Sequence, residues 1–348
     1  MKIASYAAQS PRSPLAPHAL ERRELRPDDV GIEILYCGVC HSDLHMARND
    51  WNRAIYPVVP GHEIVGRVTA VGAQVSKFKV GDAVAVGCFV DSCQHCDQCH
   101  RGNEHMCREL LTETYNGKDR VTGETTYGGY SKYIVVKDDF VLRMPEGLDM
   151  SRAAPLLCAG ITTYSPLRTW NVGPGSRVGV VGLGGLGHMA VKLAVGMGAH
   201  VSVLSRSKAK EADALALGAD RLLDTSDAQA LAEAANSFDV IIDTVPVKHD
   251  INPYIPLLDI DATLVLVGQL GHMDELFTVP AIMGRRRIAG SMIGGIAETQ
   301  EMLDFCARQQ ILPECETIRM EQINEAFERM ERSDVRYRFV IDMASLND

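Results

Sequence analysis

Residues 177–188 read RVGVVGLGGLGH, an apolar run followed directly by a glycine-rich turn. The run Arg177–Val181 predicts a buried strand, and the residues after the turn predict a helix. A G-x-G-x-x-G turn between a strand and a helix is typical of dinucleotide binding, because its glycines let the backbone approach the pyrophosphate. A plain structural turn is the alternative, but the strand and the helix around it favour the cofactor. The expected cofactor contacts in this turn are Gly182, Gly184, Gly185, Leu186 and Gly187.

The chain downstream continues this pattern as far as about residue 267. Short apolar runs alternate there with alanine- and leucine-rich stretches. Alternation of this kind predicts right-handed βαβ units and an α/β fold with a doubly wound parallel sheet. Further strands are predicted at His200–Leu204, Arg221–Leu223, Asp239–Ile242 and Thr263–Val267, and helices near Leu186–Met197, Lys208–Leu217 and Ala228–Ala235.

The first part of the chain, up to about residue 150, has a different pattern of apolar and polar residues. Short β-like runs broken by Gly and Pro predict a mainly β domain with long loops, with strands at Gly31–Tyr36, Ile64–Val71, Ala83–Val86 and Tyr133–Val136. After about residue 295 the tail shows two helical patterns and a strand, Thr299–Gln309, Glu321–Arg332 and Arg336–Asp342. This tail is too short for a domain of its own. We therefore expect one domain from residues 1–157 and 295–348, and a second from residues 158–294.

Composition narrows the class of protein. The chain has 348 residues, of which 46% are hydrophobic and 23% are charged, which is ordinary for a folded protein with a sizeable core. Its net charge of −10 disfavours nucleic acid as a partner. No apolar stretch predicts a signal peptide or a membrane span. Ten cysteines without a secretory signal favour the cytoplasm, where clustered thiols bind metal rather than form disulfides.

Four cysteines follow the pattern C-x2-C-x2-C-x7-C: Cys93, Cys96, Cys99 and Cys107. Four thiolates in a tetrahedron are the preferred shell of a structural zinc ion, and the two-residue gaps allow the sulfurs to converge. Unrelated loop cysteines, or a zinc ribbon for nucleic acid, are the alternatives. The zinc ribbon is the weaker alternative, because the negative net charge of the chain disfavours binding to nucleic acid.

A second group of possible ligands is dispersed along the sequence. Cys40 lies in CGVCHSDLH (37–45), His62 and Glu63 in GHE (61–63), and Cys158 in LLCAG (156–160). Three mixed N and S ligands with an open fourth position are typical of a catalytic zinc site. Spacing alone is weak support here, since a lone cysteine such as Cys158 is more often an inert core residue.

The end of the second predicted strand indicates which nicotinamide cofactor is bound. A carboxylate at this point would bind the ribose diol of NAD, and none is present. Hydroxyl groups and cations follow instead, which suits the 2′-phosphate of NADP. A solvated basic turn is the alternative. The expected contacts are Ser205, Arg206, Ser207 and Lys210, with Lys208 between them.

Taken together, CGVCHSDLH, PGHEIVG, the four-cysteine loop, LLCAGITTYSPL and GLGGLGH resemble the motifs of zinc-dependent medium-chain alcohol dehydrogenases, in the same order. The resemblance is strongest to the cinnamyl alcohol dehydrogenase group with its bacterial NADP-dependent aldehyde reductases. It covers nearly the whole chain and ends in DVRYRFVID (334–342). It implies a GroES-like catalytic domain and a Rossmann domain. It also implies two zinc ions per chain, a catalytic one on Cys40, His62 and Cys158 and a structural one on the four-cysteine loop.

The resemblance also implies roles around the catalytic zinc. Glu63 lies just behind the ion, and Asp43 accepts the free ring N–H of His62. Ser42 exchanges a proton with the substrate alcohol, and His45 relays it to solvent. On the cofactor side, Thr162 lies near the nicotinamide, and the backbone of Ile293–Gly295 meets the carboxamide.

The implied reaction is the interconversion of alcohols and aldehydes with NADP(H), with aldehyde reduction expected in the cell. Trp51, Leu110, Tyr115 and Ile293 are possible apolar walls, which would favour aromatic or medium-chain aliphatic primary alcohols. A homodimer formed through an edge strand of the cofactor domain is expected. A polyol or secondary-alcohol dehydrogenase remains an alternative, whereas the ligand set disfavours a zinc-free quinone reductase and a catalytically silent binding protein.

Overall fold

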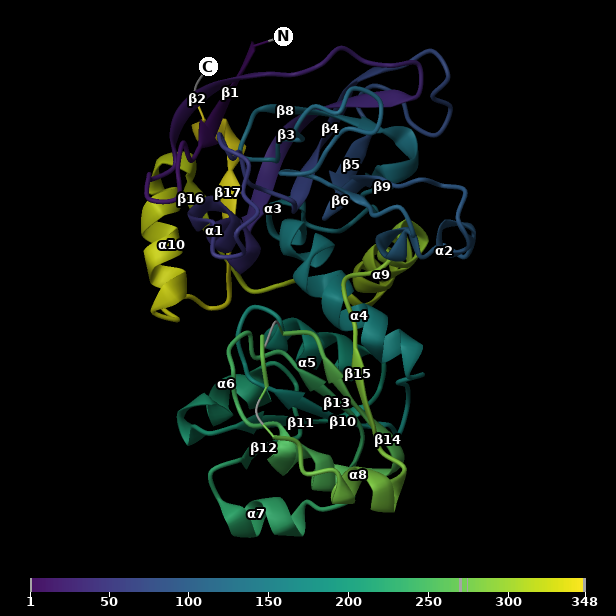
Figure 1. Cartoon of the computed structure of the whole chain (residues 1–348), viewed down its shortest axis with the longest axis vertical. Helices are drawn as coiled ribbons and strands as arrows, with labels where there is room; N and C mark the ends of the chain where they lie inside the picture. Colours follow the sequence, from purple (N-terminus) through teal and green to yellow (C-terminus); the bar gives the residue numbers. More distant parts are fainter. Residues whose placement is uncertain (1, 269–270, 274, 347–348) are drawn as a thin grey trace. The chain divides into compact units, whose positions relative to one another are not determined.

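The glycine-rich turn joins strand β10 (Arg177–Val181) to helix α5 (Gly187–Gly196) in the computed structural model of the chain. The structure describes residues 2–268, 271–273 and 275–346. They form two units: unit 1 is Met1–Cys158 with Gly294–Asp348, and unit 2 is Ala159–Ile293 (Figure 1). Each boundary differs by one residue from the expected one. Cys158 belongs to unit 1, and its sulfur lies 3.9 Å from that of Cys40.

Unit 2 contains a six-stranded parallel sheet with the strand order β12-β11-β10-β13-β14-β15. The order reverses at β10, so the glycine turn lies at the switch point where sheets of this kind bind ligands. The predicted parallel sheet is confirmed, although its edge strand β15 was not predicted, because the run RIAG is short and weakly apolar. The other strands are β11 (His200–Ser205), β12 (Arg221–Asp224), β13 (Phe238–Asp243), β14 (Leu258–Leu266) and β15 (Arg287–Gly290).

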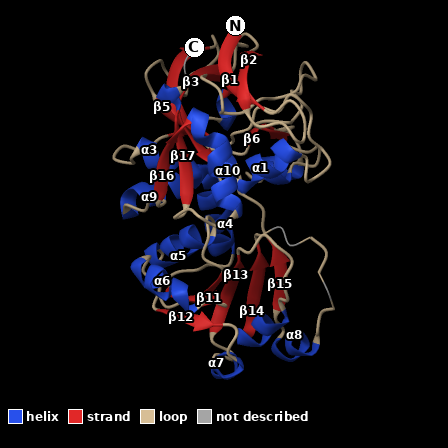
Figure 2. Ribbon diagram, turned by 90° about the vertical axis from the view of Figure 1, so that its left-hand side faces the viewer, coloured by secondary structure: helices blue, strands red, loops and turns tan. Residues whose placement is uncertain are grey.

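Helices pack against this sheet, as Figure 2 shows for α5 and α6. The helix predicted at Lys208–Leu217 is split into a 3-10 turn, η4 (Lys208–Lys210), and α6 (Glu211–Ala216). The remaining helical segments of unit 2 are α4 (Ala159–Thr169), α7 (Ala228–Glu233), η5 (Asn252–Leu257) and α8 (Val279–Gly284).

Unit 1 is built on a sheet in which the long strand β3 pairs with β4, β8 and β17. The pairing of β17 with β3, with Phe339 opposite Val39, brings the C-terminal tail back to the first part of the chain. The strands of this sheet are β3 (Asp29–Val39), β4 (Ile64–Val71), β5 (Ala83–Val86), β8 (Tyr133–Lys137), β9 (Leu142–Arg143), β16 (Cys315–Arg319) and β17 (Arg338–Asp342). Two small sheets pair β1 (Lys2–Ala7) with β2 (Ala16–Glu21) and β6 (Phe89–Asp91) with β7 (Thr112–Glu113).

Helix α1 (His41–Arg48) begins directly after β3 and was not predicted. Its start is stabilised by a capping box, in which the Asp43 carboxylate accepts the backbone N–H of Cys40 at 2.9 Å. The other helices of unit 1 are α2 (Asp97–His100), α3 (Met150–Ala153), α9 (Ile296–Gln309) and α10 (Ile323–Glu331). Its 3-10 turns are η1 (Glu104–Met106), η2 (Asp138–Phe140), η3 (Ala154–Leu157), η6 (Met320–Gln322) and η7 (Met343–Ser345).

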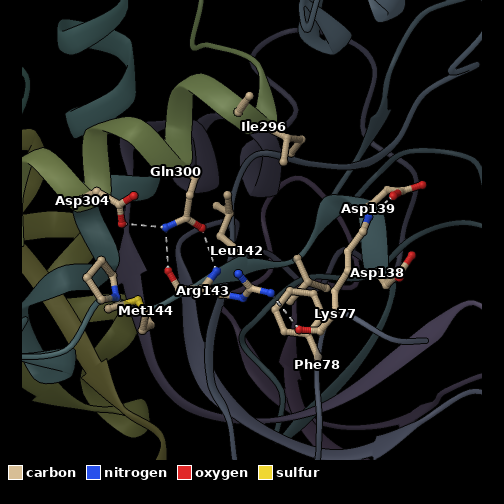
Figure 3. Close-up of a pocket in the computed structure, with 13 residues that line it drawn as sticks. Lys77, Phe78, Asp138, Asp139, Leu142, Arg143, Met144, Ile296, Gln300 and Asp304 are labelled. Carbon is tan, nitrogen blue, oxygen red and sulfur yellow. Dashed lines mark hydrogen bonds and ion pairs between the residues drawn. The ribbon is translucent and has the colours of Figure 1, made fainter.

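A surface pocket of unit 1 is lined by residues of β9, η2 and α9 (Figure 3). Gln300 of α9 forms two hydrogen bonds to the backbone of Arg143, one from the N–H and one to the carbonyl oxygen. None of the predicted site residues lines this pocket. Among the described residues, no helix is long and apolar enough to cross a membrane.

Candidate metal centres and cofactor site

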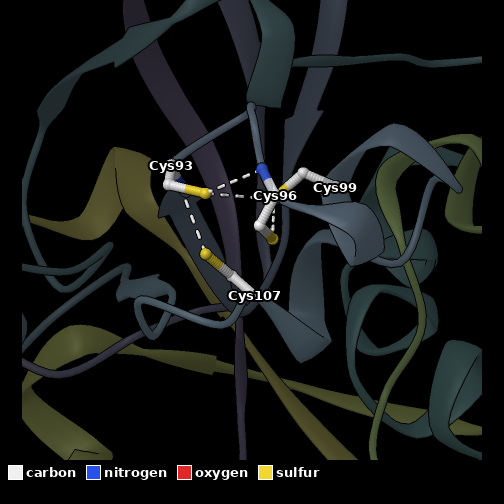
Figure 4. Close-up of side chains that lie close together, drawn as sticks. All are labelled: Cys93, Cys96, Cys99 and Cys107. Carbon is white, nitrogen blue, oxygen red and sulfur yellow. Dashed lines mark hydrogen bonds between the residues drawn. The ribbon is translucent and has the colours of Figure 1, made fainter.

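The four cysteines of the predicted structural zinc site converge in space (Figure 4). Their sulfurs all lie within 4.8 Å of one another, with 3.8 Å between Cys93 and Cys99 and 3.5 Å between Cys96 and Cys99. Four sulfurs around one zinc at Zn–S distances near 2.3 Å would be roughly 3.8 Å apart. The backbone N–H of Cys96 donates to the sulfur of Cys93 at 3.3 Å, and that of Cys93 to the sulfur of Cys107 at 3.4 Å. The donor set and its spacing therefore suit a closed thiolate shell.

The second group also converges, although its members come from distant parts of the chain. One ligand atom each from Cys40, His62, Glu63 and Cys158 lies within 4.8 Å of the others. Cys40 follows β3, the pair His62 and Glu63 precedes β4, and Cys158 follows η3. Two thiols and an imidazole supply the three mixed S and N ligands that are typical of a catalytic zinc site, and the carboxylate of Glu63 lies beside them.

Asp43 holds the imidazole of this group. Its carboxylate is fully buried and lies 3.2 Å from Nδ1 of His62, which leaves Nε2 free to bind a metal. The same carboxylate accepts the backbone N–H of Gly61 at 3.0 Å and the hydroxyl of Tyr130 at 3.2 Å. Burial disfavours the imidazolium form of His62, but the charge of Asp43 outweighs this effect and raises the pKa of the ring.

Glu63 is paired with Arg338, a contact that the sequence did not reveal. The Glu63 side chain is fully buried, and its Oε1 accepts a hydrogen bond from the Arg338 guanidinium, which also donates to the Val39 carbonyl at 3.0 Å. Burial raises the pKa of Glu63 to about 7 against the opposing charge of Arg338. Oε2 has no hydrogen-bond partner among the described residues, so it is free to face a cation. The one available signal was the arginine that begins the mainly apolar run RFVID.

Two further side chains border the Cys40 group. The sulfur of Cys88 donates to the Leu157 carbonyl at 3.6 Å and also interacts with the thiol of Cys158. The buried ring of Tyr115 stacks on His62 with ring centroids 5.7 Å apart. The sequence suggested Tyr115 as a possible apolar wall of the substrate site. It assigned no role to Cys88, because a lone cysteine outside a motif does not indicate a function.

The predicted proton relay lies on α1. Ser42 and His45 are three residues apart and therefore face the same side of the helix. His45 is half-buried, with Nδ1 2.7 Å from the Asp50 carboxylate and its ring 5.5 Å from that of Trp51. Trp51 packs against a cluster of Met46, Val58 and Tyr115. Leu110 is 78% exposed, so it does not belong to the core.

In unit 2 the three spaced glycines have different surroundings. Gly182 has a φ of +86° and makes the tight turn after β10. A Cβ at Gly187 would lie 2.3 Å from the carbonyl oxygen of Gly182, so only glycine permits this packing of helix on strand. A Cβ at Gly184 would meet nothing within 4 Å, which leaves its backbone open to a phosphate.

The predicted phosphate contacts surround the end of β11. Arg206 and Ser207 are exposed and Ser205 is half-buried, and Lys210 extends back to the glycine turn, where Nζ donates to the Leu183 carbonyl at 3.3 Å. The adjacent acid, Asp224 of β12, accepts hydrogen bonds from Ser226 and lies 3.8 Å from Lys208. Thr162 on α4 and Ile293 at the end of unit 2 belong to the same unit as this group.

Comparison with known proteins shows which family the chain belongs to. Residues 26–146 match the family described as alcohol dehydrogenase GroES-like domain, and residues 185–308 match zinc-binding dehydrogenase. The chain is 54% identical to NADP-dependent alcohol dehydrogenase C 1 of Mycolicibacterium smegmatis, over 99% of both chains. It is also 54% identical to aldehyde reductase YahK of Escherichia coli, over 100% of both chains. The solved cinnamyl alcohol dehydrogenase SbCAD4 of Sorghum bicolor superposes with a TM-score of 0.96 at 46% identity, covering 100% of each chain.

The fold, the two cysteine-containing clusters and the glycine turn agree with these matches. The chain belongs to the zinc-dependent medium-chain alcohol dehydrogenase family and is similar to its cinnamyl alcohol dehydrogenase group.

Proposed function

We propose that this protein interconverts primary alcohols and aldehydes with NADP(H), with aldehyde reduction as its direction in the cell. The observation that carries the proposal is the convergence of Cys40, His62 and Cys158 beside Glu63. Relatives named NADP-dependent alcohol dehydrogenase and aldehyde reductase support the reaction class. The corresponding domains are the GroES-like catalytic domain of unit 1 and the NADP-binding Rossmann domain of unit 2.

Two zinc ions per chain are part of the proposal. The four-cysteine loop would hold one with no open position, so that ion stabilises a loop and takes no part in chemistry. Cys40, His62 and Cys158 would hold the other. The unpartnered Oε2 of Glu63 suits a cation at this point, and so does Asp43, whose carboxylate accepts the Nδ1–H of His62.

Zinc bound there would supply Lewis-acid polarisation of the substrate oxygen, and NADPH bound to unit 2 would supply the hydride. Residues of the chain itself would orient the zinc ligand His62 and transfer the proton. Asp43 fixes the orientation of His62. Ser42 donates the proton that completes the product alcohol, and His45, one turn further along α1 and half-exposed, exchanges that proton with solvent.

NADP is the proposed cofactor because the end of β11 offers hydroxyl groups and cations to a 2′-phosphate. Ser205, Arg206, Ser207 and Lys210 would contact the phosphate, while Asp224, the acid opposite Ser205 on β12, accepts hydrogen bonds from Ser226. Thr162 and Ile293 would contact the nicotinamide end. The proposed location is the cytoplasm, in keeping with ten cysteines that are all free of disulfide bonds.

Aromatic or medium-chain aliphatic substrates are proposed on account of the apolar rings beside the site, Trp51 and Tyr115. The decisive experiment is a steady-state panel of aldehydes, ketones and polyols with NADPH and NADH, together with total zinc per chain. We expect efficient reduction of aromatic or medium-chain aldehydes with NADPH, and two zinc ions. Preferred turnover of polyols or ketones would favour the alternative dehydrogenase, and one zinc ion would show that a site had been misassigned.

A homodimer formed through the edge of the unit 2 sheet is also proposed. In the described part of the chain, strand β15 pairs with β14 alone, and exposed apolar side chains lie close by in the chain on α8: Ile282 is 70% and Met283 81% exposed. Exposed strand edges and apolar patches of this kind favour pairing between chains.

The double variant Ile282→Glu with Met283→Glu is therefore expected to be a monomer, since two buried charges at an interface are costly. Light scattering after size-exclusion chromatography should give one chain mass for the variant and twice that mass for the wild type. The control Leu215→Glu places a charge on an exposed apolar site of α6 and should stay dimeric. A wild-type monomer, or a dimeric double variant, would reject this interface.

A further inference from the structure

The four-cysteine loop contacts the first turn of α9 (Ile296–Gln309) through one carboxylate. Glu104 lies in η1, between Cys99 and Cys107, and its Oε2 accepts the backbone N–H of Ile296 at 3.1 Å. The N-cap of α9 is Gly295, which has no side chain that could accept such a bond. Helix starts leave backbone N–H groups without partners, and a nearby oxygen stabilises them. The carboxylate of Glu104 therefore caps the start of α9, in place of the side chain that Gly295 lacks.

Gly295 is itself packed against the same loop. A Cβ at this position would lie 1.8 Å from the carbonyl oxygen of Gly102 and 2.7 Å from Oε2 of Glu104. The carbonyl oxygen of Gly295 accepts both the backbone N–H of Thr299, at 2.9 Å, and its hydroxyl, at 2.7 Å. The loop and the start of α9 thus fit together so closely that only glycine is possible at residue 295.

The position of this contact depends on the cysteines. The backbone N–H of Gly102 donates to the Cys99 carbonyl at 3.0 Å, and the N–H of Cys107 donates to the Glu104 carbonyl at 3.1 Å. The two residues that touch α9 are therefore each one hydrogen bond away from a proposed zinc ligand. Four bound thiolates would hold both ends of the segment that carries Glu104.

The chain just before this contact is strained. Ile293 has a φ of +40°, a left-handed conformation that β-branched residues rarely adopt. Such a conformation persists only where the surrounding structure holds it in place. Gly295 follows two residues later, and the hydrogen bonds of Gln300 to Arg143 anchor the next turn of α9 (Figure 3).

We infer that Glu104 is a positioning residue, which transmits the order of the four-cysteine loop to the backbone of Ile293–Gly295 and thereby sets the affinity for NADPH. The inference rests on the proposed function, in which this backbone meets the nicotinamide carboxamide. It assigns the proposed structural zinc site a role in cofactor binding besides its role in stability.

The test uses Glu104→Ala in the full-length protein with its zinc. Because a lost helix cap typically shifts a local equilibrium by about fivefold, we expect the NADPH dissociation constant to rise by about that factor. The constant is measured by quenching of protein fluorescence, well below the unfolding temperature, with two zinc ions verified per chain. Glu104→Gln keeps an accepting oxygen and should restore most of the affinity. In the absence of cofactor, hydrogen exchange of residues 288–299 should be faster in Glu104→Ala than in wild type.

The matched control is Glu109→Ala. Glu109 is an exposed acid of the same loop that pairs with His95 at 2.7 Å and with Arg120 at 3.5 Å, and we expect wild-type affinity and exchange from it. A Glu104→Ala protein that unfolds at lower temperature but binds NADPH and exchanges as wild type does would overturn the inference. Equal effects of the two alanine variants would also overturn it. Wild-type protein that binds no NADPH would reject the proposed function and this inference with it.

Discussion

Turnover of an aromatic aldehyde with NADPH should fall about a thousandfold in a Cys40→Ala variant, while the zinc ion proposed for the four-cysteine loop remains. The thiol of Cys40 lies 3.9 Å from that of Cys158 and supplies one of the two sulfurs in the group formed with His62 and Glu63. Its removal leaves too few ligands there, and a metal's stabilisation of charge on the reacting oxygen is worth several kcal/mol. The four-cysteine loop is untouched by the substitution. Steady-state kinetics and elemental analysis of zinc on the same sample check both halves of the result.

The matched control is Cys306→Ala, which also removes a buried thiol. Cys306 is fully buried on α9, 3.7 Å from the sulfur of Met302 and outside both metal clusters. Its alanine variant should retain two zinc ions and turnover close to that of wild type. Wild-type turnover in Cys40→Ala would reject Cys40 as a ligand. Loss of both ions would show that the two sites are not independent.

Replacing Arg206 by Asp is expected to lower the ratio of kcat/KM for NADPH to that for NADH by about a hundredfold. A guanidinium bound to a phosphate contributes about 1.5–3 kcal/mol, and a carboxylate in its place repels the 2′-phosphate while it can accept the ribose diol of NADH. Both values come from initial rates with one aldehyde at several concentrations of each cofactor.

Lys208→Asp provides the control, because it changes the charge by the same amount two residues away. The ammonium group of Lys208 lies 3.8 Å from Asp224, and Lys208 is not among the proposed phosphate contacts. Its substitution should lower the ratio less than tenfold, because the Lys208 side chain is 72% exposed and its charge is screened by solvent and salt. Equal cofactor ratios in wild type and Arg206→Asp, or equal shifts in the two variants, would show that Arg206 does not recognise the phosphate.

Features that depend on residues close together in the chain could be predicted from the sequence. The strand, glycine turn and helix around residues 177–196 follow from neighbouring residues, and the parallel sheet follows from the repetition of that pattern. The four-cysteine loop is likewise local, since its ligands span fifteen positions. Helix α1 was missed, because its start depends on the carboxylate of Asp43, whose capping bond to Cys40 is not evident in hydrophobic periodicity. Leu110 was a candidate wall residue, although the side chain lies on the exposed part of a loop.

By itself, the sequence determined the fold class, the four-cysteine pattern and the cationic end of β11, since each depends on residues close together in the chain. The resemblance to known motifs implied that Cys40, His62 and Cys158 share one ion, but only the tertiary structure brought their ligand atoms within 4.8 Å. The pairing of Glu63 with Arg338, 275 positions apart, and the capping of α9 by Glu104 also required it. Contacts of this kind arise when whole strands and helices pack, and no local pattern of residues encodes which distant side chains will then meet.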